Sequence, residues 1–126
     1  MENRQRIGYD SYIPYNGLLV WHIDETQSGN DNQWYPGYES SGNYLVALEQ
    51  ADGLFQIEKT YPVGNSGNSG DPFPGSTSNT VFSALSTPNS NSYDGDNTYV
   101  AISNISSSSA IMTADFQVSL SSGGVD

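Results

Sequence analysis

Residues 18–24, LLVWHID, are the stretch that decides the fold. Successive side chains of a β-strand point to opposite faces, so Leu18 and Val20 share one face while Leu19 and Trp21 share the other. Both faces therefore begin with apolar residues, which is typical of a strand that lies inside a sheet rather than at its margin. We place this segment in the interior of a sheet.

Further short apolar runs follow, and clusters of Gly, Asn, Ser and Pro separate them, which indicates an all-β domain. After the run at 44–51 (YLVALEQA), the Asp52-Gly53 pair predicts a type I′ hairpin that returns residues 54–58 antiparallel to it. A short helix after Gly53 is the alternative. The segments 81–85, 99–105 and 111–120 complete the predicted strands.

The last predicted strand has the clearest alternation, and it is expected to turn every second side chain toward the core: Met112, Ala114, Phe116, Val118 and Leu120. Long polar loops are expected at 61–80 and 87–97. Together these features predict a mainly β protein, an antiparallel β-sandwich-like single domain over residues 1–120, followed by a flexible tail at 121–126.

The composition excludes several functions. The 126 residues include 3 basic and 14 acidic residues, giving a formal net charge of −11, so the chain lacks the cations needed to bind nucleic acid or an anionic membrane surface. No run approaches the roughly 20 apolar residues of a membrane span. The absence of cysteine excludes disulfides, thiol catalysis and cysteine-bound zinc. An acidic chain rich in Ser, Asn, Gly and Tyr is typical of a secreted or cell-surface protein.

His22 is the only histidine in the sequence. A zinc peptidase needs two or three imidazole or carboxylate ligands, usually within H-E-x-x-H, and that motif is absent. A serine hydrolase could use His22 with Asp24, but no G-x-S-x-G segment accompanies them. We therefore predict no catalytic residue and expect His22 to be a packed, hydrogen-bonded residue of its strand.

Two groups of loop residues are candidates for ligand binding. Oxygen ligands suitable for calcium occur in two acidic turns and comprise Asp24, Asp31, Asn32, Asp94 and Asp96, although the same residue types also form turns for backbone reasons. Trp34, Tyr35 and Tyr38 lie in a polar segment, where they form either a stacking platform for a sugar or a lid over the edge of the core.

Several segments, taken in order, resemble one family. They are 2–5 (ENRQ), 8–10 (GYD), 17–25 (GLLVWHIDE), 46–53 (VALEQADG), 70–75 (GDPFPG), 87–90 (TPNS) and 102–106 (ISNIS). In this order they are similar to the region downstream of the zinc-binding helix in the immune inhibitor A family of secreted metallopeptidases. The resemblance extends from Glu2 to about Val118.

The resemblance implies a secreted zinc endopeptidase as the parent protein, whose centre is an H-E-x-x-H-x-x-G-x-x-[HD] helix followed by a Met-turn. This chain departs from that pattern because it carries none of those ligands. We therefore expect a non-catalytic C-terminal β portion that packs beside the catalytic half and lines its substrate cleft, with zinc only in that other half and calcium as a further ligand. The alternative is a carbohydrate-binding or adhesive β-sandwich module, with a glycan or protein ligand.

Overall fold

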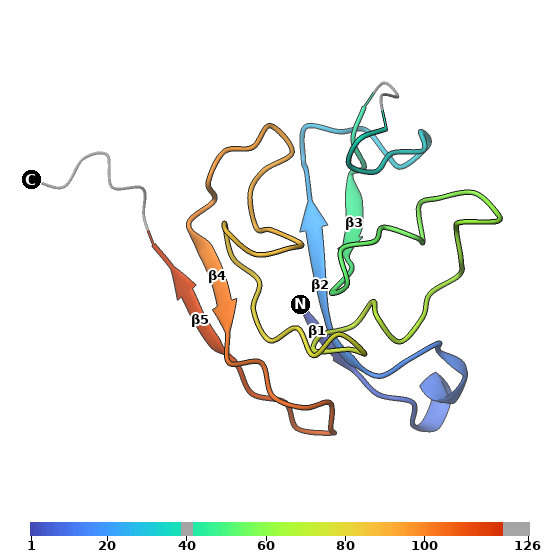
Figure 1. The fold of residues 1–126 in the computed structure, drawn as a ribbon, viewed down its shortest axis with the longest axis vertical. Helices are drawn as coiled ribbons and strands as arrows, with labels where there is room; N and C mark the ends of the chain where they lie inside the picture. The colour runs from blue at the N-terminus through green and yellow to red at the C-terminus, as the bar shows by residue number, and fades with distance from the viewer. Residues whose placement is uncertain (39–41, 120–126) are drawn as a thin grey trace, which may run out of the picture.

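The computed structural model describes residues 1–38 and 42–119 and is mainly β, with antiparallel sheets, as the sequence predicts. Figure 1 shows the chain from its N-terminal strand to its outermost C-terminal strand. The elements in order are β1 (Glu2–Arg4), the 3₁₀-helix η1 (Gly8–Tyr12), β2 (Gly17–Ile23), β3 (Val46–Glu49), β4 (Val100–Ser103) and β5 (Asp115–Val118). The predicted tail at 121–126 lies outside the described residues.

The first sheet has the order β1-β2-β3, so β2 is its central strand, as its two apolar faces predict. β1 pairs with the first half of β2 and β3 with the second half, both antiparallel. In the second pairing, Val20 lies opposite Glu49 and His22 lies opposite Ala47, so these four side chains share one face.

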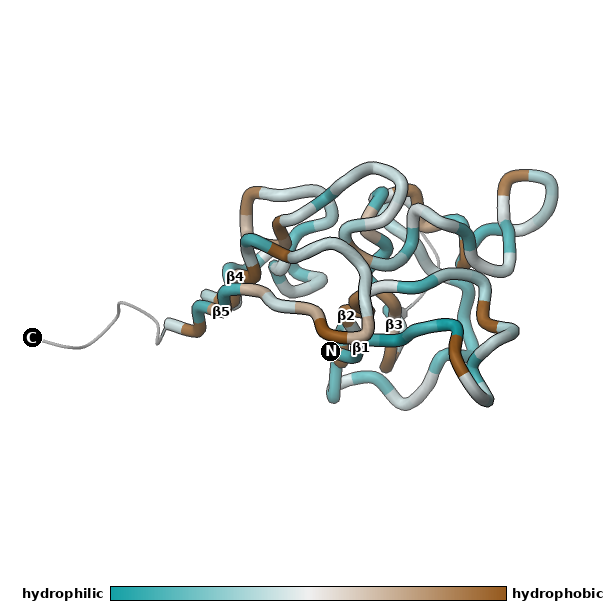
Figure 2. Tube along the Cα trace, turned by 90° about the horizontal axis from the view of Figure 1, so that it is seen from below, coloured by the Kyte–Doolittle hydropathy of each residue, from teal (hydrophilic) through white to brown (hydrophobic). Residues whose placement is uncertain are grey.

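The second sheet consists of β4 and β5 alone and joins the first through a common core. A backbone bridge between Phe82 and Ile102 links β4 to the preceding loop. The core residues come from both sheets and from the loops between them: Leu18, Val20, Ala51, Phe73, Phe82, Ile102 and Ile105. Coloured by hydropathy, the loops are mostly white or teal, with single brown residues among them (Figure 2).

The hairpin predicted at Asp52-Gly53 is wrong, because residues 54–58 form no strand. A type I′ turn needs positive φ at both central residues, and of this pair only Gly53 has it, at 68°. The turn instead closes when Gly53 N–H donates to Gln50 O at 2.8 Å. The chain after β3 then pairs with a distant loop, as the N–H groups of Ala51 and Asp52 donate to the carbonyls of residues 71 and 70.

The predicted inward face of the last strand is only partly covered. Met112 and Ala114 pack against the core, but Phe116 is 57% exposed and Val118 is 77% exposed. Phe116 lies opposite buried Ile102 and shares its face of the sheet. However, β5 is the outer strand, and the core ends beneath β4. Leu120 lies outside the described residues.

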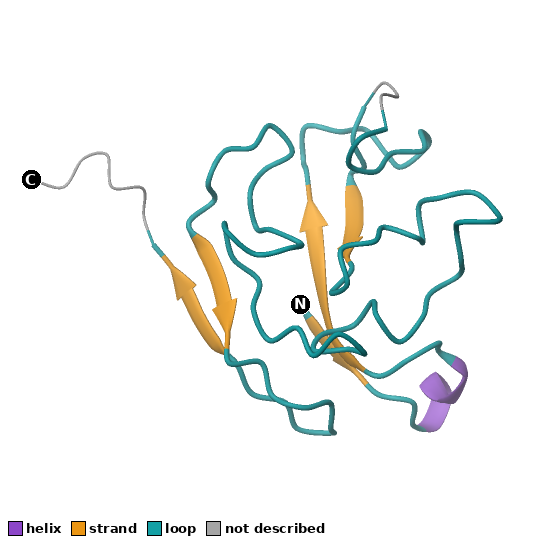
Figure 3. Cartoon of the chain, viewed as in Figure 1, coloured by secondary structure: helices purple, strands orange, loops and turns teal. Residues whose placement is uncertain are grey.

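Loops make up most of the described chain, and Figure 3 shows how they surround the strands. Residues 81–85 form no strand beyond isolated bridges at Phe82 and Ser83. The predicted loop at 61–80 has no helix or strand apart from the bridge at Phe73. Within the described residues, no helix is long and apolar enough to cross a membrane.

Candidate functional site

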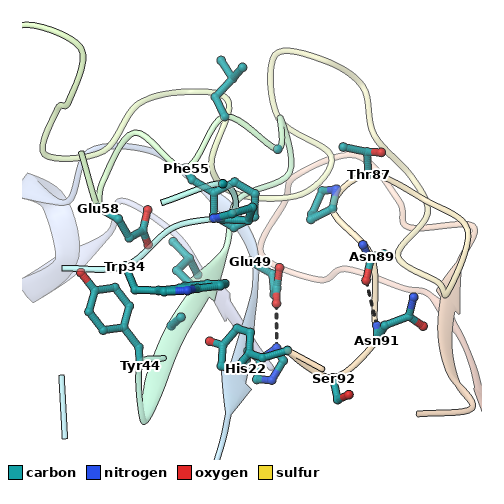
Figure 4. Close-up of a pocket in the computed structure, with 18 of the residues that line it drawn as sticks. His22, Trp34, Tyr44, Glu49, Phe55, Glu58, Thr87, Asn89, Asn91 and Ser92 are labelled. Atoms are coloured by element: carbon teal, nitrogen blue, oxygen red, sulfur yellow. Dashed lines mark hydrogen bonds and ion pairs between the residues drawn. The ribbon is translucent and has the colours of Figure 1, made fainter. Parts of the chain in front are cut away.

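A cleft of about 610 Å³ opens beside β2 and β3. Residues of these two strands and of three loops line it. The loops contribute residues near 34–37, 53–59 and 87–95 (Figure 4). Aromatic rings, two carboxylates and several amides line it, and the residues used below are His22, Trp34, Tyr44, Glu49, Phe55, Glu58, Asn89, Asn91 and Tyr93.

His22 and Glu49 form the floor of the cleft. Their side chains emerge on the same face of the sheet, and His22 Nδ1 lies 3.0 Å from Glu49 Oε1. Glu49 is buried, and the His22 ring stacks on the ring of Tyr93, with centroids 4.0 Å apart and planes 5° from parallel. His22 is therefore a packed and hydrogen-bonded residue, as the sequence predicts.

Tyr93 connects this pair to the aromatic wall. The rings of Trp34 and Tyr93 meet edge to face, with their centroids 4.6 Å apart and their planes at 63°. This arrangement is favourable for two aromatic quadrupoles. Burial, with Glu49 nearby, raises the pKa of the Tyr93 hydroxyl, so this group stays protonated. The Tyr93 hydroxyl and Asn91 Oδ1 are buried atoms with no hydrogen-bond partner in the described chain.

Glu58 is the second carboxylate of the cleft. Its Oε2 accepts a 2.5 Å hydrogen bond from Gln50 Nε2, and Gln50 is completely buried. Gln50 Oε1 in turn accepts from the N–H of Gln56 at 2.8 Å. Burial is the main cause that raises the pKa of Glu58, and the nearby charges of Asp71 and Glu49 add to it.

Phe55 lies over the cleft in a costly backbone conformation. Its φ is 52°, in the left-handed region, where a bulky residue is rare and costs on the order of 1–2 kcal/mol. In the close-up Phe55 lies above the Trp34 indole (Figure 4). Ser78, Tyr99 and Asn104 also have positive φ among the described residues, and of the four only Phe55 lines this cleft.

The predicted stacking residues are divided between two places. Trp34 lines the cleft, whereas Tyr35 and Tyr38 stack on each other with centroids 4.9 Å apart. Lys59 Nζ lies 5.1 Å from the Tyr35 centroid and donates to the carbonyl of Leu54 at 2.6 Å. The tyrosine pair is therefore a separate surface feature beside the cleft.

The predicted calcium ligands do not come together into one group. Both carboxylate oxygens of Asp24 accept hydrogen bonds from its own turn, from Thr26 and Gln27, and these bonds lower its pKa. Asp96 closes the other turn through its backbone, with Ser92 N–H donating to Asp96 O at 2.9 Å. Within residues 1–38 and 42–119, no three His, Cys, Asp or Glu side chains are placed to hold a metal ion. Calcium binding by Asp24, Asp31, Asn32, Asp94 and Asp96 stays a prediction.

Four residues of the cleft are not predicted from the sequence: Glu49, Phe55, Glu58 and Tyr93. Glu49 had a usable signal, because pairing the two strongest strands with alternation places it on the His22 face. The other three lie in loops, and their convergence depends on contacts between distant segments.

Comparisons of the chain with protein-family models, curated sequences and solved structures find no match. The cleft supplies aromatic faces, carboxylates and amides, which are groups that recognise a ligand.

Proposed function

We propose that this chain is the non-catalytic β portion of a secreted metallopeptidase-like protein and packs beside the catalytic half. The observation that carries the proposal is an exposed apolar face on the first sheet, opposite the core. On that face Trp21 is 40% exposed, Ile23 62% and Val46 38%.

The register explains why these side chains gather. Trp21 lies opposite Leu48 and Ile23 opposite Val46, so apolar side chains from two adjacent strands form one continuous patch. We call the patch formed by Leu19, Trp21, Ile23, Val46 and Leu48 the Trp21 face. A central strand with apolar residues on both faces is usually covered on both, and exposed patches of this kind mark contact surfaces. A second folded unit that covers the Trp21 face is the partner that the proposal requires.

The segments that carry the family resemblance also meet in space. The backbone of Leu18 in GLLVWHIDE exchanges hydrogen bonds of 2.9 Å with that of Phe73 in GDPFPG. Ala51 N–H of VALEQADG donates to Asp71 O at 2.9 Å, and the side chain of Asn79 joins Ala51 O to Thr87 O of TPNS. The segments that carry the resemblance therefore contact one another in the fold, which supports the proposal that they belong to a single family region.

A fluorescence experiment tests the docking of this face. The chain is produced alone and joined to the polypeptide encoded directly upstream. Trp34→Phe, together with phenylalanine in place of every tryptophan of the added polypeptide, makes Trp21 the only tryptophan of both proteins. We expect acrylamide quenching of Trp21 to fall several-fold in the joined protein, because the partner shields the indole. The matched control carries Trp21→Phe and reports on Trp34, whose quenching is expected to change little.

Three results would contradict the proposal. Equal quenching of Trp21 in both proteins would show that the face stays open. An upstream reading frame without an H-E-x-x-H helix would remove the catalytic half. Hydrolysis of casein by the isolated chain with added zinc, above a metal-free control, would contradict its non-catalytic role.

A carbohydrate-binding or adhesive module is the second candidate, and one observation favours it. Trp34 faces the cleft, and Asn89 and Asn91 line it, with Asn91 Oδ1 lacking a partner. Stacking on an aromatic ring combined with amide hydrogen bonds is a chemistry suited to sugars. Affinity electrophoresis against a panel of soluble glycans tests it, since binding that is lost in Trp34→Ala would support the module.

A further inference from the structure

Glu58 is a carboxylate of the cleft that forms no ion pair within the described residues. Among the described residues the ion pairs are Arg4 with Glu2 and His22 with Glu49. The three basic residues of the sequence are Arg4, Arg6 and Lys59, and only Lys59 lines the cleft. Its ammonium group donates to the carbonyl of Leu54 and lies near the ring of Tyr35.

The surroundings of Glu58 disfavour an isolated negative charge. The carboxylate is partly buried, and Glu49 and Asp71 repel its charge. The nearest strong donor is the neutral amide of Gln50, which binds Oε2. A cation placed beside Glu58 would offset both the burial and the repulsion.

The walls around this carboxylate are aromatic. Glu58, Trp34 and Tyr44 lie next to one another at one side of the cleft, and Phe55 lies above them (Figure 4). Aromatic faces attract a cation through their quadrupoles, by about 2 kcal/mol when the cation is desolvated. One of these rings belongs to Phe55, whose backbone φ is 52°.

We propose that the cleft binds the cationic side chain of an arginine or lysine residue in a polypeptide, with Glu58 as its counter-ion and Trp34 and Phe55 packed against its stem. A flat guanidinium can donate hydrogen bonds to a carboxylate through its N–H groups while an aromatic ring packs against its face, which suits this lining. The inference does not depend on docking of the Trp21 face, because the cleft lies on the side of the sheet that carries His22 and Glu49.

The test compares two small probes of nearly the same shape. Nα-acetyl-argininamide carries a guanidinium, and Nα-acetyl-citrullinamide replaces it with a neutral urea. Binding is followed by NMR on the backbone amide signals of the cleft residues, which every variant below retains. We expect the arginine probe to bind about tenfold more tightly than the citrulline probe, as a charge-assisted hydrogen bond provides.

Two variants assign the preference to the cleft. Glu58→Gln keeps a hydrogen-bond acceptor for Gln50 and is expected to remove the tenfold preference, leaving the citrulline probe unaffected. Glu25→Gln, which removes an exposed charge that does not line the cleft, is the matched control and is expected to retain it. Trp34→Leu is expected to weaken both probes, and thermal melting verifies that each variant is folded.

The outcomes separate the possibilities. Equal binding of the two probes, or no binding of either, would overturn the inference. A preference that survives in Glu58→Gln but falls in Glu25→Gln would show general attraction to an acidic protein and would also overturn it. Binding of chito- or malto-oligosaccharides in place of the arginine probe would assign the cleft to a glycan.

Discussion

Replacing two phenylalanines by alanine should have very different effects on stability, because one is buried and the other is not. Phe73 is completely buried and meets Phe82 edge to face, with ring centroids 6.0 Å apart. Phe116 has the stronger sequence pattern of a core residue, yet it is 57% exposed on β5. The pair therefore tests whether the core ends where the structure places its edge.

The magnitude follows from burial. Phe73→Ala removes a fully buried ring and leaves a cavity, which costs about 3–5 kcal/mol of unfolding free energy. An unfolding entropy of roughly 2.1 cal/mol/K per residue gives about 0.26 kcal/mol/K for a chain of this length, so Tm should fall by about 11–19 °C. Phe116→Ala should cost less than about 1 kcal/mol and lower Tm by no more than about 4 °C.

Urea unfolding followed by tryptophan fluorescence measures both changes in the isolated chain. If Phe73→Ala does not fold, Phe73→Leu keeps the test valid, because it is expected to cost about 1–2 kcal/mol. A loss for Phe116→Ala as large as that for the Phe73 variant would refute the reasoning. The second sheet would then have to be covered on its Phe116 side.

Three further predictions concern the cleft and its surroundings. Gln50→Ala should lower stability by about 2–4 kcal/mol in urea melts, because it opens a cavity and leaves the N–H of Gln56 without its acceptor. Burial raises the pKa of Glu58, so the folded state keeps that proton to higher pH than the unfolded state and stability falls as pH rises above the ordinary glutamate value. Glu58→Gln should therefore stabilise the protein more at pH 7 than at pH 4, and parallel urea titrations at the two pH values with equal differences would contradict this. Millimolar calcium should raise Tm modestly relative to a chelator, because a ligand bound only by the folded state stabilises it, and an unchanged Tm would count against any site at Asp24, Asp31 or Asp94.

The sequence predicted the central strand well, because its signal is local and strong. The observed bounds of β2, Gly17–Ile23, differ from the predicted 18–24 by one residue at each end. The alternation of that strand also identified which side chains share a face. A run of seven residues that begins apolar on both faces and lies between loop-forming segments favours a buried strand over a helix, so tertiary contacts had little to override.

The turn after β3 shows where local signals fail. Asp-Gly indicates a reversal, and the chain does reverse at Gly53, but the segment that pairs with Ala51 and Asp52 is 70–71, nearly twenty residues later. Residues 54–58 and this distant loop could each pair with the chain after β3, and tertiary contacts determine that the loop does. Leu18 and Phe73 exchange backbone hydrogen bonds, which brings the loop against the first sheet. No short sequence window contains that information.

The cleft could not be predicted for the same reason. His22 and Glu49 come from paired strands, but Phe55, Glu58 and Tyr93 reach them from two loops that are separated by some thirty residues. Buried side chains hold the first of these loops, with Gln50 bonded to both Gln56 and Glu58. Polar residues of a kind common in any loop therefore hold the loop that lines this side of the cleft.

Alternation along a strand predicts which side chains share a face of the sheet. Whether that face is buried depends on which other part of the fold packs against it. The face of β4 and β5 that carries Phe116 becomes exposed only at its outer strand, where a sheet normally ends. The Trp21 face is different, because it lies on a central strand and runs without interruption onto Val46 of β3. A sheet edge explains the first exposure, but nothing within the described chain explains the second. Shielding of Trp21 by another folded unit is therefore the more informative measurement of what this protein does.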